Sequence, residues 1–162
     1  MKIHNFADIH TIKSDGDVTL KLDISMDRFS NQYNKAQYYL DSMVMTHMIP
    51  FMPMVTGTFI NQTKAMSASI AGTGYVVAAA PPYGRFLYEG KNMVGESTGS
   101  AWAMRGEKKV PVSQYSGNTA AKEFLEYNKT AHPSVTDHWY EAAKRQHIKT
   151  WTRVVKRMAG GG

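Results

Sequence analysis

The sequence predicts an α+β fold: a small antiparallel sheet packs against a long helix of the N-terminal half and a C-terminal helix, with a long loop or arm between them. Three observations lead to this prediction. Apolar and polar residues alternate over residues 18–24, which is the period of a half-buried strand. Apolar residues then recur every three or four positions over 29–47, and again over 140–158, which is the period of a helix with one packed face.

The first element expected is a β-hairpin. Asp15-Gly16 is a turn signal, and residues 9–13 before it are expected to pair with the strand that follows. The apolar positions of that second strand are Val18, Leu20, Leu22 and Ile24. Because side chains of a strand alternate between its faces, these four positions share one face.

The long helix follows directly. Its expected apolar face consists of Phe29, Tyr33, Ala36, Leu40, Met43 and His47. Ser25 or Asp27 is expected to cap its start by accepting a bond from a free backbone N–H. Pro50 and Pro53 end it, because proline lacks the donor that a continuing helix needs.

The middle of the chain predicts a second hairpin and then an arm. Residues 65–70 and 74–80 flank a glycine turn and are rich in small and β-branched residues, which favours a hairpin. Residues 91–118 are rich in glycine, serine and charge, so we expect an extended arm or hairpin there. The chain is then one domain over residues 1–158, and residues 159–162 form a flexible Gly-rich tail.

The last helix is expected to begin near Pro133. Ser134 and Asp137 fit a capping box in which aspartate replaces the usual glutamate. The apolar face then consists of Tyr140, Ala143, His147, Trp151, Val154 and Met158. His147 lies on this face, and we expect it to be a hydrogen-bonded packing residue.

Metal and catalytic sites have little support. His138 and His147 are nine residues apart, so on a helix they point to opposite sides and cannot share an ion. The chain has no cysteine, no nucleophile elbow and no phosphate-binding loop. We therefore predict no cofactor, no metal and no enzymatic activity. A hydrolase using Glu123, Glu126 or His138 is the remaining catalytic alternative.

The charge suggests a basic surface. The formal net charge is +6. The residues expected to face a DNA channel or an acidic partner are Arg105, Lys108, Lys109, Lys144, Arg145, Lys149 and Arg153. Such a surface can contact phosphates without reading sequence, or it can be a solvated helix face. Binding of nucleic acid without sequence specificity is thus the leading alternative function. The N-terminus lacks an apolar core and no stretch is long enough to span a membrane, so we expect no membrane partner.

Three stretches resemble small neck proteins of tailed phages. They are MIPFMPMVTGTFINQT at 48–63, APPYGRFLYEGKNMVG at 80–95 and LEYNKTAHPSVTDHWYEAAKRQHIKTW at 125–151. The order and spacing agree over residues 17–157. The family is the phage minor capsid protein group, which is related to the tail-completion proteins of long-tailed phages.

The resemblance implies a structural virion protein at the head–tail junction, made in the cytoplasm of the host bacterium. It implies a homo-oligomeric ring, six- or twelve-fold, between portal- or adaptor-side and tail-side connector proteins, with genomic DNA passing through without sequence readout. The residues expected at subunit interfaces are Tyr83, Arg85, Tyr88 and Glu89, although the aromatic ones could instead close the core. The residues expected to have structural roles are Gly57, Gly90, Pro133, Trp139 and Trp151.

Overall fold

The computed structural model describes residues 8–15 and 18–160. Its elements, in chain order, are β1 (Ile9–Asp15), β2 (Val18–Ile24), α1 (Asp27–Met48), the 3-10 turn η1 (Ile49–Phe51), α2 (Thr58–Ser69), α3 (Gly84–Glu89), β3 (Met93–Gly95), β4 (Lys109–Pro111), the 3-10 turn η2 (Val112–Gln114) and α4 (Trp139–Met158). The predicted α+β class is confirmed, and in it the long helix α1 packs against the C-terminal helix α4.

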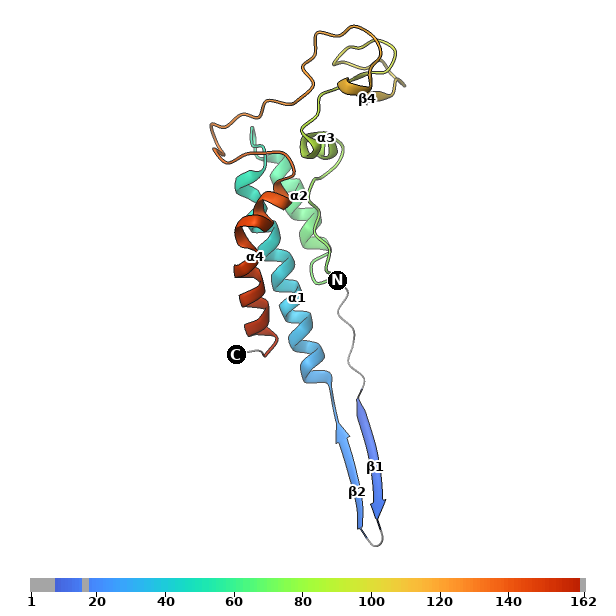
Figure 1. The fold of residues 1–162 in the computed structure, drawn as a ribbon, viewed down its shortest axis with the longest axis vertical. Helices are drawn as coiled ribbons and strands as arrows, with labels where there is room; N and C mark the ends of the chain where they lie inside the picture. The colour runs from blue at the N-terminus through green and yellow to red at the C-terminus, as the bar shows by residue number, and fades with distance from the viewer. Residues whose placement is uncertain (1–7, 16–17, 161–162) are drawn as a thin grey trace.

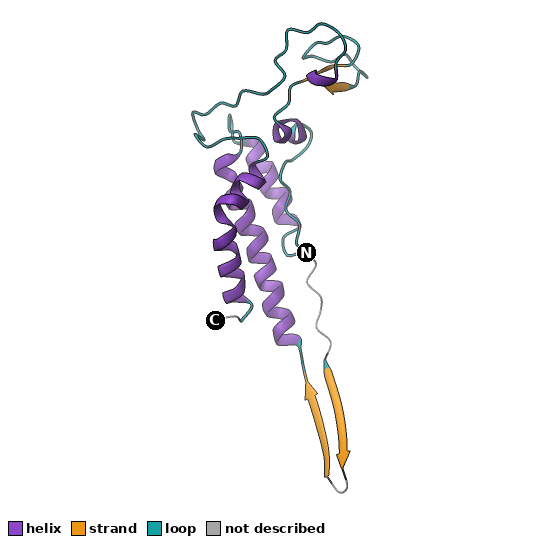
Figure 2. Ribbon diagram, viewed as in Figure 1, coloured by secondary structure: helices purple, strands orange, loops and turns teal. Residues whose placement is uncertain are grey.

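The molecule is elongated (Figure 1). Helices α1, α2 and α4 form its middle, the β1–β2 hairpin extends beyond the N-terminal end of α1, and α3 with the β3–β4 pair lies at the opposite end. Figure 2 shows that the strands are confined to these two ends. The strands form two separate two-stranded sheets. Neither sheet is laid across the helices, so the helices supply each other's buried surface.

The predicted pairing of the first two strands is confirmed. β1 and β2 are antiparallel, with Ile9 opposite Ile24 and Asp15 opposite Val18. Of the predicted turn, Gly16 lies outside the described residues. Only Ser25 and Met26 separate β2 from α1, so the hairpin continues from the end of the helix.

Helix α1 has the predicted length, but its buried face is wider than the predicted one. The predicted side-chain cap at Ser25 or Asp27 is not formed, since Met26 is the N-cap residue and no side chain caps the helix; the Ser25 hydroxyl only accepts the Asp27 N–H at 3.4 Å. The helix passes into η1, where Pro50 lies. Its buried residues are Ala36, Gln37, Asp41, Val44, Met45 and Met48. This face is rotated from the predicted one because α4 and α2 contact neighbouring sides of α1, and Phe29 at the far end is exposed.

The predicted second hairpin is wrong, since its first half is the end of helix α2. Gly57 precedes this helix with a left-handed φ of 78°, which only glycine adopts at little cost. Thr63 and Ser67 are buried on one side of α2. Their hydroxyls accept the N–H groups of Ala80 and Val77, at 3.2 and 3.1 Å. Residues 75–80 are therefore held along a helix by side-chain bonds, which take the place of a strand ladder.

The predicted capping box at Ser134–Asp137 is also wrong. Helix α4 begins at Trp139, and no side chain caps it. The N–H groups of Thr136 and His138 donate to backbone oxygens of η1 and α3, at 3.1 and 2.9 Å. These tertiary bonds hold the segment in an irregular conformation, and His138 has a left-handed φ of 42°. Pro133 lies exposed in this segment, outside the helix.

The core lies between α1, α2 and α4. Its buried residues are Val44, Met45, Met48, Met52, Ile60, Trp139, Ala143 and Trp151. The Trp139 indole N–H donates to the Ala78 oxygen at 2.7 Å. Among the helices that the structure describes, none has the length and apolar composition of a membrane-spanning segment.

Two histidines of α1 and α4 meet at the edge of this core. The rings of His47 and His147 stack with centroids 4.1 Å apart. The Trp151 indole N–H donates to His47 Nδ1 at 2.7 Å, so that nitrogen carries no proton and the His47 imidazole is neutral. Burial, and then the nearby His147, lower the pKa of His47 below its usual 6.5. His147 was predicted to be a hydrogen-bonded packing residue. It packs by stacking on His47, and the hydrogen bond from Trp151 is accepted by His47.

We expect the protein to lose stability as the pH falls from about 7.5 to about 5.5. Because the pKa of His47 is lower in the folded state, the unfolded state binds more protons below pH 6.5, which favours unfolding. Urea unfolding followed at several pH values would measure this. A His47→Gln variant should show a shallower pH dependence than the parent, while His10→Gln, on the exposed hairpin, should keep the parental slope. Equal slopes in all three proteins would contradict the prediction.

Candidate interaction surfaces

A groove between α3 and the β3–β4 pair collects four of the predicted site residues. It has a volume of about 370 Å³, and its lining includes Arg85, Glu89, Lys108 and Lys109. Arg85 Nε and Glu89 Oε1 are 3.1 Å apart and both lie on α3. Tyr83, just before α3, is 70% exposed and lies outside the groove. The structure therefore unites residues that the sequence had assigned to two separate groups, a subunit interface and a basic surface.

Tyr88 has a different place from the other predicted interface residues. Its ring packs edge-on against Trp139 with centroids 4.8 Å apart. Its hydroxyl donates to the Glu141 carboxylate on α4. Burial and this carboxylate raise the pKa of the Tyr88 hydroxyl well above its usual value. Tyr88 therefore links α3 to α4 within the molecule. Of the two roles expected for it, a subunit interface or closure of the core, this position corresponds to closure of the core.

The loop between β3 and β4 is organised around one carboxylate. Glu107 accepts bonds from the N–H and hydroxyl groups of Ser97 and Thr98, and from the N–H of Met104. The Met104 N–H and then the Ser97 hydroxyl are the main groups that lower the pKa of Glu107, to about 2. No local pattern predicts this cluster, because the five donors converge only after β3 and β4 have paired.

We expect Glu107→Gln to make this loop several-fold more sensitive to trypsin after Arg105. An amide keeps only one acceptor oxygen, so donors that share the carboxylate in the parent lose a partner. Limited proteolysis at neutral pH would measure the effect, with Glu96→Gln as the control. In the parent, the ionised Glu107 carboxylate stabilises the loop at pH values above 4.5, which is its pKa in the unfolded chain. This stabilisation is lost as the pH falls toward about 2, the pKa of Glu107 in the folded protein. Unchanged cleavage in Glu107→Gln would contradict this role.

The predicted cations divide between two separate surfaces. Arg105, Lys108 and Lys109 lie around the β3–β4 loop at one end of the molecule, whereas the others lie on α4 (Figure 1). The exposed cations of α4 are Lys144, Arg145, Lys149, Arg153, Lys156 and Arg157. Within the described ranges none of these six forms an ion pair. At 100° per residue, four of them fall within a sector of about 80°, which makes a basic stripe along α4.

An apolar groove runs between α1 and α4, and sequence reasoning missed it. Its volume is about 320 Å³. The lining residues are Leu40, Val44, Tyr140, Ile148, Trp151, Thr152, Val155 and Lys156. Ile148, on the α4 side of the groove, is 42% exposed. A signal was available, because Ile148 and Val155 are seven residues apart and extend the apolar face of α4 to one side.

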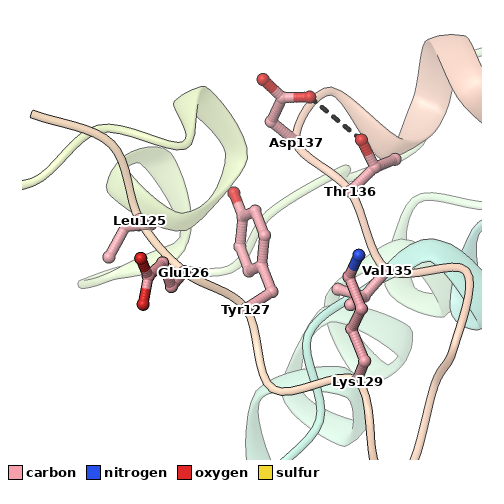
Figure 3. A pocket seen from close by; sticks show the side chains of 7 residues that line it. All are labelled: Leu125, Glu126, Tyr127, Lys129, Val135, Thr136 and Asp137. Atoms are coloured by element: carbon pink, nitrogen blue, oxygen red, sulfur yellow. Dashed lines mark hydrogen bonds between the residues drawn. The ribbon is translucent and has the colours of Figure 1, made fainter.

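The pocket in Figure 3 lies in the loop before α4, and its residues have a packing role. Its volume is about 400 Å³, and Tyr127 stands in it beside Thr136 and Asp137, which are joined by a 3.1 Å bond. The Tyr127 hydroxyl donates to the Leu87 oxygen, and burial raises its pKa to about 12. Gly90 closes the other side, since a side chain there would meet Asp137 at 3.0 Å and its φ is +64°. These contacts hold the loop before α4 against α3.

The residues of the catalytic alternative are dispersed. His132 Nδ1 bonds to the Met52 oxygen at 2.8 Å in the segment before α4, His138 directly precedes α4, and His147 lies within it. Over the described residues, no three His, Asp or Glu side chains are grouped closely enough to hold a metal ion. Glu126 is exposed and pairs with Lys122 at 2.6 Å, in a segment that is not helical.

Comparison of the chain with protein-family models, curated proteins and solved structures finds no match. The candidate sites therefore rest on the geometry of this chain. That geometry consists of open grooves and exposed charged side chains.

Proposed function

We propose that this chain is a structural subunit of a tailed-phage virion, a head–tail connector or tail-completion protein of the minor capsid family. The observation that carries the proposal is the elongated body with a β-hairpin projecting at one end and a β3–β4 arm at the other (Figure 1). A subunit of a connector must contact neighbours in its own ring and in the rings above and below. Projections at both ends of a rigid helical body suit those contacts.

In this proposal the function is geometric and needs no catalysis. Subunits form a homo-oligomeric ring that joins portal-side to tail-side proteins and keeps the DNA path continuous. The basic stripe of α4 would provide a positive field near DNA without reading its sequence. The groove beside α3, lined by Arg85, Glu89, Lys108 and Lys109, is the surface proposed for a neighbouring connector protein.

Imaging of particles of the phage that encodes the chain tests this directly. We expect ring density at the portal vertex into which α1, α2 and α4 fit as one unit. Particles that carry a peptide tag after residue 160, labelled with an antibody, would identify the chain independently. Purified particles that lack this chain would overturn the proposal.

Direct binding of nucleic acid is the second candidate, favoured by the six exposed cations of α4. If it were the main function, the affinity of the isolated chain for duplex DNA would fall steeply with salt concentration. The slope of log affinity against log salt concentration would then correspond to contacts with several phosphates. Replacing Arg145, Lys149 and Arg153 by glutamine would remove about three phosphate contacts and reduce that slope. A connector subunit should instead bind weakly, and the same replacements should leave its incorporation into particles largely intact.

A further inference from the structure

The β1–β2 hairpin has an apolar face that nothing in the described chain covers. Residues directly opposite in an antiparallel pair point to the same side, so Ile9 and Ile24 share a face. Ile24 is 38% exposed and Ile9 is also exposed. An isolated two-stranded hairpin is at best marginally stable in water, so this face needs a partner.

The hairpin cannot reach the apolar groove of its own chain. Only Ser25 and Met26 join it to α1, and two residues span at most about 7 Å. The hairpin leaves the end of α1 in the direction away from α4 (Figure 1). A second copy of the chain has no such restriction.

The hairpin and the groove match in length. The strands of the hairpin have seven residues each, which corresponds to about 23 Å. The groove on α4 runs from Tyr140 to Lys156, which corresponds to about 24 Å of helix. The hairpin face carries Ile9 and Ile24 at the end nearest α1, and the groove is lined mainly by apolar side chains, with Ile148 and Val155 on its α4 side.

The two surfaces are also complementary in charge. Residues 8–24 carry four aspartates and two lysines. Helix α4 carries six cations and one glutamate, and Lys156 borders the groove itself. An acidic hairpin lying along a basic helix gains favourable electrostatics at the rim of an apolar contact.

We propose that the β1–β2 hairpin of one copy docks, by the face that carries Ile9 and Ile24, into the α1–α4 groove of the next copy. The two surfaces are different, so the contact is head-to-tail and repeats around a closed ring. The proposal rests on the proposed ring function and specifies how its subunits are joined. It gives the hairpin face the cover that its own chain does not provide.

Cysteine cross-linking tests the contact, because the chain has no native cysteine. Ile24→Cys and Ile148→Cys, both at exposed positions, are prepared as separate full-length proteins, mixed at high concentration and oxidised. We expect a disulfide-linked dimer that contains one copy of each variant, identified by mass spectrometry. A single chain with both substitutions should give a ladder of cross-linked oligomers.

Ile12→Cys is the matched control. Ile12 is 68% exposed on the same hairpin, but it pairs with Lys21 and lies on the opposite face. A disulfide requires Cα atoms within about 7 Å, so Ile12→Cys with Ile148→Cys should give at least about tenfold less product. Equal yields from the two mixtures, or no product from Ile24→Cys with Ile148→Cys, would overturn the proposal.

Two further results separate this inference from the function on which it rests. If duplex DNA protects Ile148→Cys from alkylation and added protein does not, the groove binds nucleic acid and the docking proposal is overturned. If particles contain the chain at the portal vertex but the specific cross-link is absent, the hairpin contact fails while the connector function stands. If the cross-link forms but particles lack the chain, self-association stands and the connector function fails.

Discussion

Replacing Trp139 by alanine is expected to lower the free energy of unfolding by about 3–5 kcal/mol. Trp139 is fully buried at the start of α4 and packs against Phe59 and Tyr88. Its removal leaves a large cavity, since side chains of both α2 and α3 pack against the indole. The Ala78 oxygen also loses its 2.7 Å donor. Denaturant unfolding followed by circular dichroism would measure the loss.

Two control variants make this prediction specific. Trp102→Ala removes the same side chain from a position that is 87% exposed, so its unfolding free energy should change by less than about 0.5 kcal/mol. Trp139→Phe keeps an aromatic ring but loses the indole N–H, and its loss should lie between those of the two alanine variants. Equal stabilities of Trp139→Ala and Trp102→Ala would show that the core does not depend on this contact.

Replacing Asp41 by alanine should cost about 3 kcal/mol, a large effect for a polar residue. The Asp41 carboxylate is buried within α1, where one oxygen accepts the Gln37 amide at 2.7 Å. The other oxygen accepts the N–H groups of Gly72 and Gly74, at 2.8 and 3.1 Å. Alanine would remove all three bonds and leave the buried Gln37 amide without its acceptor.

Hydrogen exchange distinguishes this role from a general loss of stability. In Asp41→Ala, the amides of Gly72 and Gly74 should exchange faster than those of the α1 core, because their acceptor is gone while the helix remains. Asp23→Ala serves as the control, since Asp23 pairs with His10 at the exposed hairpin, and its cost should be less than about 1 kcal/mol. Unchanged protection of Gly72 and Gly74 would contradict the role of Asp41 as their anchor.

The elements that the sequence predicted well depend on local periodicity. The helical spacing from Phe29 to His47 and the prolines after it were sufficient to predict α1, because both signals act within a few residues. The β1–β2 pairing was predictable for the same reason, since a turn signal joins two neighbouring segments. Periodicity could not show that α2 and α4 would contact adjacent sides of α1, so the buried face was predicted about a quarter-turn away.

The wrong predictions of the second hairpin and of the capping box share a cause. The small and β-branched residues around Gly72 favour a hairpin by composition, yet Thr63 and Ser67 bind the following segment to α2 by their hydroxyls. Likewise, a capping box at Ser134 is a valid local option. It is lost because backbone groups of η1 and α3 accept the N–H groups that the helix would have used. In both places, distant hydrogen bonds outweighed a local preference of about 1 kcal/mol.

Local sequence patterns were enough to predict the α+β class, the long helix, the hairpin, the basic character of α4 and the structural glycines Gly57 and Gly90. These follow from spacing, charge and backbone freedom, which are properties of neighbouring residues. The folded chain was needed to show that Tyr88 faces inward to Glu141, that Arg85 and Lys109 border one groove, and that an apolar groove remains open between α1 and α4. Those features require residues far apart in the chain to meet, and the packing of whole elements determines which of them do.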